Sequence, residues 1–145
     1  MKQKTTRTYL GTTSYMAPEL LAGKEYIPSQ VDIFAVGALS FILNSAYFGF
    51  NKASLEDPTY NLILQGKTDS FWRYHDAKKR DIPDFFSPDF KKMVSRMIHP
   101  ISNQNDPNDP NYQYEPSDLS KRAIIKDIKN SDWYKNTPSA TLEDA

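Results

Sequence analysis

The sequence contains no cysteine, and this absence excludes disulfide bonds, thiolate metal sites and a thiol nucleophile. Its two histidines, His75 and His99, stand far apart and match no spacing typical of metal ligands. We interpret both as ordinary surface or hydrogen-bonded histidines. The sequence therefore predicts no metal site.

An excess of charge of one sign is also missing, because 18 Lys and Arg residues balance 18 Asp and Glu residues. Without such an excess the chain has no field that gathers nucleic acid or an anionic membrane, and we predict neither as a partner. The most apolar stretch, residues 31–43, is too short and interrupted to span a membrane. Residues 1–10 contain no secretory signal, so the cytoplasm is the expected location.

No segment alternates apolar and polar residues over a useful length, so the pattern predicts a mainly α-helical fold without strands. The chain of 145 residues is long enough for one domain with a buried core. Residues 31–43 are apolar on every face at helical spacing, which indicates a central helix surrounded by protein. Ser29 and Asp32 have the spacing of a capping box, and this predicts a helix start near residue 30.

Three further helices are predicted from local signals. Residues 57–66 begin with Asp-Pro and end with glycine, and residues 87–98 begin with Ser-Pro and continue with a one-sided apolar stripe. Residues 124–129 form the last predicted helix, and Trp133 and Tyr134 after it are expected to fold back onto the domain.

Two segments support neither helical nor strand periodicity. Residues 102–116 read SNQNDPNDPNYQYEP, a cluster of Asn, Asp and Pro that we interpret as a loop insertion. Residues 135–145 are expected to form a disordered tail.

Residues 11–19 read Gly-Thr-Thr-Ser-Tyr-Met-Ala-Pro-Glu and resemble the end of the activation segment of eukaryotic Ser/Thr protein kinases. Further matches follow in the family's order. Residues 32–37 resemble the start of its central helix, and residues 121–134 resemble the arginine, helix and aromatic pair that close its C-lobe. In amino-acid sequence, residues 47–74 most resemble the calcium/calmodulin-dependent kinase group.

The resemblance covers residues 8–134 and implies the helical C-lobe portion of a kinase-like fold. Residues 1–19 would then be the end of the activation segment with the substrate-facing loop. Residues 20–134 would form the helical remainder, with the loop insertion at about 102–116.

The same resemblance implies substrate-facing roles near the N-terminus. Gly11, Thr12 and Tyr15 match the loop that positions the substrate hydroxyl, a role that we favour for Thr12 over the alternative of a hydroxyl that caps a turn. Thr8 matches the position of an activating phosphothreonine, with an unmodified loop threonine as the alternative.

Four residues match structural positions of the family. Glu19 and Arg122 match a buried ion pair that pins the activation segment to the helical lobe. Asp32 matches an aspartate that supports the catalytic loop, and the capping box described above is its alternative role. Gly37 matches a glycine at a close helix contact. None of these residues is expected to be catalytic.

The motifs that perform phosphoryl transfer are missing from the 145 residues. The five glycines form no Gly-x-Gly, and neither His-Arg-Asp nor Asp-Phe-Gly occurs. We therefore expect this portion, which lacks the N-lobe and the catalytic loop, to bind no cofactor and to be inactive alone. ATP and Mg²⁺ would act in the intact parent kinase, whose partners would be a protein substrate and the missing N-lobe and catalytic loop.

A second hypothesis is a non-catalytic, pseudokinase-like interaction module. Both hypotheses leave the central helix at residues 31–43 without the cover that the family's preceding segments provide. The sequence thus also predicts an exposed apolar patch on this helix.

Overall fold

The computed structural model describes residues 13–24, 26–100 and 122–136. Within these ranges all regular secondary structure is helical, which confirms the predicted fold class. In chain order the elements are η1 (Thr13–Tyr15), α2 (Pro18–Leu21), α3 (Pro28–Ser45), α4 (Pro58–Leu64), α5 (Thr68–Lys78), α6 (Pro88–Met97), α7 (Ile125–Asn130) and α8 (Asp132–Asn136).

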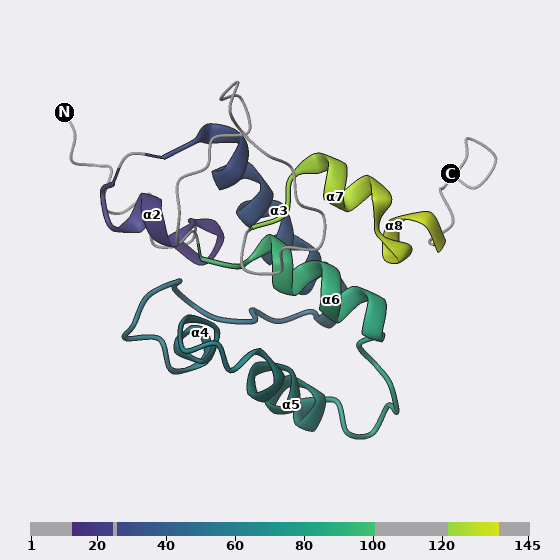
Figure 1. Ribbon diagram of the computed structural model, residues 1–145. Coiled ribbons are helices and arrows are strands. Elements are labelled where there is room, and N and C mark those ends of the chain that lie inside the picture. Colours follow the sequence, from purple (N-terminus) through teal and green to yellow (C-terminus); the bar gives the residue numbers. More distant parts are fainter. Residues whose placement is uncertain (1–12, 25, 101–121, 137–145) are drawn as a thin grey trace.

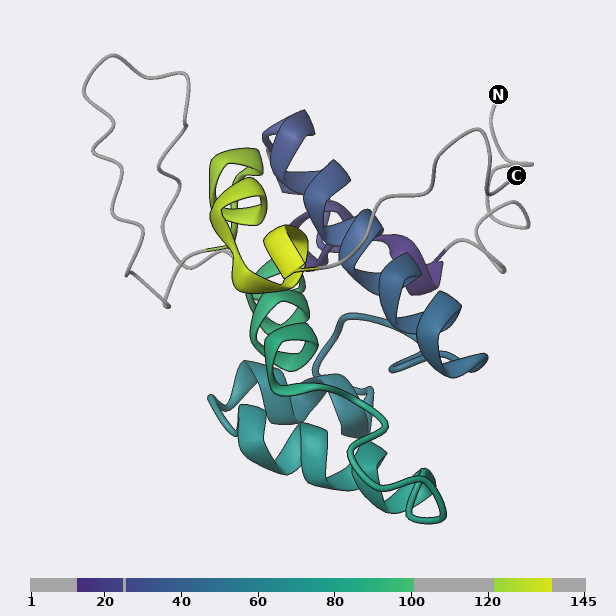
Figure 2. The same cartoon turned by 90° about the vertical axis from the view of Figure 1, so that its right-hand side faces the viewer.

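Helix α3 runs through the middle of the molecule and packs on α6 (Figure 1). Helices α4 and α5 form a pair on one side of α6, and α8, with α7 packed against it, lies on the other side. Figure 2 shows the same order from the side, with α6 between the α4–α5 pair and α7–α8.

Several predictions from the sequence fall on residues outside the described ranges. These are the roles of Thr8, Gly11 and Thr12 and the loop insertion at 102–116. Of the predicted tail, residues 135 and 136 complete α8, and the remainder lies outside the described residues.

The start of α3 differs from the predicted capping box. The helix begins at Pro28, the residue before it is Ile27, and no side chain caps the first turn. Proline suits this position because its φ is already helical and an N–H there would have no helical partner. The role of Ser29 as a cap is therefore wrong, and Asp32 lies one turn further into the helix.

The predicted starts of α4 and α6 are confirmed. Ser87 caps α6 by accepting a hydrogen bond from the N–H of Phe90 at 3.1 Å. Asp57 caps α4 and also holds the preceding loop. Its carboxylate accepts hydrogen bonds from four backbone N–H groups, those of Asn51, Lys52, Thr59 and Tyr60.

Gly37 allows α3 and α6 to approach closely, as the resemblance implied. A Cβ atom at this position would lie 2.7 Å from Cβ of Met97 and 3.1 Å from Cγ2 of Ile98. Any larger residue would force the two helices apart at the centre of the core.

The predicted last helix is observed as α7. Its first turn has no side-chain cap at Ile124, but the Asp127 carboxylate reaches back and accepts the N–H of Ile124 at 2.9 Å. Trp133 packs edge-on against Phe90, as expected. Tyr134 does not fold back and is half-exposed, because neighbouring residues of a helix point about 100° apart.

Helix α5 was not predicted from the sequence. It buries Phe71, Trp72 and His75 on one face, and the remainder of the helix is largely polar. The apolar face becomes recognisable at helical spacing only when His75 is counted as a core residue.

The side chain of His75 is fully buried among aromatic rings, including those of Phe41 and Phe71. Its Nε2 lies 3.0 Å from the carbonyl oxygen of Gly49, which can only accept, so Nε2 carries the hydrogen. Its Nδ1 accepts from the hydroxyl of Tyr47 at 3.1 Å. The interpretation of His75 as a hydrogen-bonded histidine is confirmed.

One side of α3 remains open. Val36, Leu39 and Leu43 are 49%, 41% and 77% exposed, which confirms the predicted apolar patch and shows that described residues do not surround this helix. Despite this apolar character, neither α3 nor another helix within the described ranges has the length and hydropathy needed to cross a membrane.

The burial of His75 predicts a pH-dependent stability. Burial lowers the pKa of His75 from 6.5 to about 4. Between these values the unfolded chain binds a proton that the folded chain excludes. The free energy of unfolding should therefore fall as the pH is lowered through this window, and the contribution is complete above pH 6.5.

Urea unfolding at several pH values between about 4 and 7 measures this slope. We expect His75→Gln to flatten it, because glutamine does not titrate, whereas the control His99→Gln should retain most of it. Equal slopes for the original chain and His75→Gln would contradict the prediction.

Candidate functional site

Arg122 and Glu19 form a buried ion pair between the two ends of the described chain. The guanidinium contacts both carboxylate oxygens, with Nη1 donating to Oε2 at 2.6 Å and Nη2 donating to Oε1 at 3.0 Å. The Arg122 side chain is fully buried and that of Glu19 nearly so. Two parallel hydrogen bonds fix the orientation of both groups as well as their distance.

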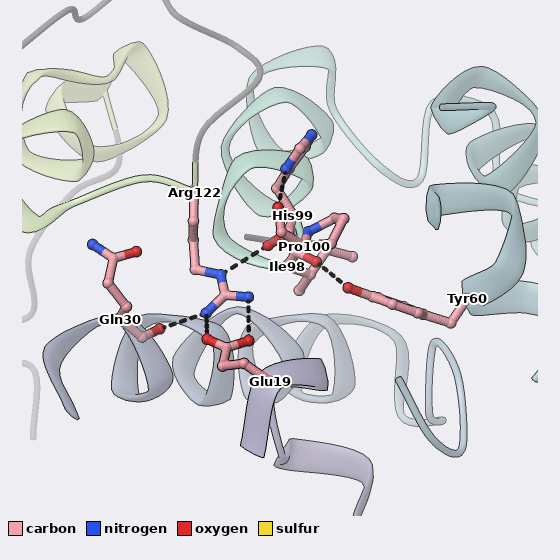
Figure 3. A network of polar contacts seen from close by, with 7 residues as sticks. All are labelled: Glu19, Gln30, Tyr60, Ile98, His99, Pro100 and Arg122. Carbon is pink, nitrogen blue, oxygen red and sulfur yellow. Dashed lines mark hydrogen bonds and ion pairs between the residues drawn. The ribbon is translucent and has the colours of Figure 1, made fainter. Parts of the chain in front are cut away.

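The remaining donors of Arg122 bind backbone carbonyl groups of two other elements (Figure 3). Nε donates to the carbonyl oxygen of His99, just after α6, at 2.8 Å. Nη1 also donates to the carbonyl oxygen of Gln30 in α3 at 3.1 Å. One side chain thus joins α2, α3 and the end of α6.

Aromatic side chains enclose this network. The Arg122 guanidinium carbon lies 5.1 Å from the centre of the Phe34 ring. The Tyr60 hydroxyl donates to the carbonyl oxygen of Ile98 at 2.9 Å, next to the His99 carbonyl that Arg122 binds. Burial raises the pKa of Tyr60, so its hydroxyl keeps its proton and remains a donor.

The segment before Glu19 is fastened to the loop after α3. Ser14 Oγ donates to the carbonyl oxygen of Asn51 at 3.0 Å. The partly buried ring of Tyr15 lies edge-on to Phe48, with 6.3 Å between the ring centres. Of the predicted substrate-facing residues, the structure therefore places Tyr15, and it describes neither Gly11 nor Thr12.

Asp32 is exposed on α3 and takes no part in the hydrogen bonds of Arg122 given above. It shares one side of the helix with the exposed apolar residues Val36, Leu39 and Leu43, since these positions are separated by four, three and four residues. The carboxylate therefore stands at one end of an open apolar stripe.

The described part of the site holds a chain segment in a fixed position. Within the described ranges no three His, Asp or Glu side chains lie close enough together to hold a metal ion. What the geometry offers is a rigid frame that sets the short segment from η1 to α2 against the helical body.

Sequence reasoning missed part of this frame. It named Glu19 and Arg122 but not the carbonyl acceptors at Gln30 and His99, because every residue has a backbone carbonyl and the sequence does not mark those used. Phe34 could have been placed beside this frame from the sequence, since it follows Gln30 by one helical turn and faces the same side of α3.

Comparison with known proteins identifies relatives. The model of the protein kinase domain family matches residues 1–105. CBL-interacting protein kinase 29 of Oryza sativa subsp. japonica is 37% identical over 93 residues, which are 64% of this chain and 18% of that protein. CBL-interacting serine/threonine-protein kinase 14 of Arabidopsis thaliana is 30% identical over 128 residues, 88% of this chain and 22% of that protein.

A further relative is the maternal embryonic leucine zipper kinase of Xenopus laevis. It is 29% identical over 136 residues, 94% of this chain and 16% of that protein. The chain thus spans about a fifth of the length of the curated relatives it matches.

The burial of the ion pair predicts a large cost for removing one partner. Arg122→Ala strands the Glu19 carboxylate, and we expect the free energy of unfolding to fall by about 3–5 kcal/mol. Glu19→Gln combined with Arg122→Met removes both charges and should cost less than the sum of the single changes. Urea unfolding at neutral pH measures these differences.

Lys91→Ala is the matched control, because it breaks the partly exposed ion pair of Lys91 with Asp76. Its expected cost is at most about 1 kcal/mol. If Arg122→Ala and Lys91→Ala lowered the free energy of unfolding by similar amounts, burial would not explain the contribution of the Arg122–Glu19 pair.

Proposed function

Because the chain belongs to the protein kinase domain family, we propose that it forms the substrate-binding part of the helical C-lobe of a Ser/Thr protein kinase. The resemblance inferred from residues 11–19 is confirmed at the level of the family. In the intact enzyme the reaction would be transfer of the terminal phosphoryl group of ATP to a serine or threonine of a protein.

The observation that carries the proposal is the buried contact of Glu19 with Arg122. Glu19 ends the motif of residues 11–19, and Arg122 binds it to α3 and to the end of α6. A substrate hydroxyl must be held within a fraction of an ångström of its reactive position, so a rigidly anchored segment suits this role.

Residues at the start of the motif would then face the peptide substrate. Gly11 and Thr12 are proposed to hold the backbone and the acceptor hydroxyl, and Tyr15, supported by Phe48, would form one wall of the site. Thr8 is proposed as a phosphorylation site that orders the segment through its added negative charge.

Asp32 and the apolar stripe on α3 are proposed to receive the segments that carry the chemistry. The exposed Asp32 carboxylate could accept backbone N–H groups of a catalytic loop, and Val36, Leu39 and Leu43 would be covered by the same segments. Since the 145 residues contain no motif for ATP or Mg²⁺, we propose that they do not transfer phosphate alone.

The exposed stripe on α3 also supports the second hypothesis, a non-catalytic interaction module. In that case Val36, Leu39 and Leu43 would bind a separate protein instead of kinase segments. The two hypotheses differ in whether the chain can complete an active kinase.

The test is a chimera in which the N-lobe and catalytic loop of a CBL-interacting kinase precede this chain. We expect Mg-ATP-dependent phosphorylation of a Ser/Thr peptide, at least tenfold weaker after Thr12→Ala because the acceptor hydroxyl loses its support. Thr13→Ala is the matched control and should retain most of the activity. Phosphate incorporation from labelled ATP is the measurement.

Equal activity of the Thr12→Ala and Thr13→Ala chimeras would contradict the role of Thr12. Phosphorylation by the 145-residue chain alone would contradict its dependence on other segments. An inactive chimera, together with a chain that unfolds cooperatively alone, would favour the interaction module.

A further inference from the structure

Helices α5 and α6 enclose a groove of about 660 Å³ that belongs to neither the ion pair nor the motif of residues 11–19. Two contacts join its walls. The indole N–H of Trp72 donates to Ser95 Oγ at 2.7 Å, and Lys91 is ion-paired to Asp76 at 2.6 Å. Because Trp72 is buried, the groove is a fixed feature of the helix packing.

Positive side chains outnumber negative ones in this groove. Its lining includes four basic and two acidic side chains, Arg73, Lys91, Lys92, Arg96, Asp69 and Asp76. The formal excess of two positive charges contrasts with the net charge of zero of the whole chain. The groove is therefore more positive than the chain as a whole.

The internal ion pairs leave two cations available. Lys91 is neutralised by Asp76, and Arg96 is paired with Asp127 on the far side of α6. Arg73 and Lys92 are exposed, and within the described ranges neither forms an ion pair. Arg73 donates to Ser70 Oγ at 3.0 Å, an uncharged acceptor, so both side chains keep their positive charge available to a ligand.

The arrangement of the cations indicates the kind of ligand. Lys92 lies on the α6 wall and Arg73 on the opposite α5 wall, so the two available cations are separated across the groove. Charges spread along two walls fit separated carboxylates better than one compact polyanion. The aliphatic parts of these long side chains also provide apolar surface between the charges.

We propose that the groove between α5 and α6 binds an extended acidic peptide segment of a partner protein. Aspartate and glutamate side chains of that segment pair with Arg73 and Lys92, and the apolar residues between them contact the stems of the groove's side chains. Nucleic acid is the poorer fit, because the Asp69 carboxylate in the lining would repel a continuous row of phosphates, whereas a peptide can place an uncharged residue beside it. The binding does not depend on phosphoryl transfer.

Fluorescence anisotropy of the 145-residue chain with a fluorescein-labelled peptide of Glu-Glu-Leu repeats tests the proposal. We expect Arg73→Glu and Lys92→Glu each to weaken binding about threefold to tenfold, and added salt to weaken it further. Lys129→Glu is the matched control, since it makes the same change of charge at an exposed position of α7 outside the groove. It should change the affinity less than about twofold.

The proposal would be overturned by no binding to the original chain, by equal weakening by Lys129→Glu, or by equal binding of a Gln-Gln-Leu peptide. An oligothymidylate that binds as tightly as the acidic peptide would identify the groove as a general polyanion site and would also overturn it. Circular dichroism melts check that each variant folds, and Arg73→Gln with Lys92→Gln replaces any variant that does not.

Discussion

The described structure depends on the buried guanidinium of Arg122. Four of its N–H donors are used, two on the Glu19 carboxylate and two on backbone carbonyl groups. The three acceptor residues, Glu19, Gln30 and His99, lie in different parts of the fold, so a single planar group fixes the relative positions of α2, α3 and the end of α6 (Figure 3). Lysine could not replace it, because a single ammonium group lacks the flat fork that reaches these acceptors together.

Helix α3 itself has two sides of different character. One side is packed on α6, where Gly37 permits contact with Met97, and carries the aromatic core around Phe34 and Phe41. The other side presents Asp32 at the start of an open apolar stripe. The same helix therefore supplies both part of the interior that holds Glu19 and an open apolar surface.

The elements that the sequence predicted are those with local signals. Asp57 and Ser87 each precede proline, and the capping geometry follows from these residue pairs alone. Helix α5 has no such start signal, and its core face includes a histidine, so periodicity did not reveal it. For the site, the resemblance named Glu19 and Arg122 from their motifs. The carbonyl acceptors and the groove between α5 and α6 depend on how distant helices meet, which the residue pattern does not encode locally.

The ion pair also has a consequence for the order of assembly. Glu19 and Arg122 are 103 positions apart, so their contact closes nearly the whole described chain. Helices and hairpin-like helix pairs such as α4–α5 involve only near neighbours and can form early, whereas a contact of this span is formed after most of the chain has been ordered. During synthesis the N-terminal part emerges first. The carboxylate of Glu19 can therefore gain this partner only after Arg122 has left the ribosome, 103 residues later.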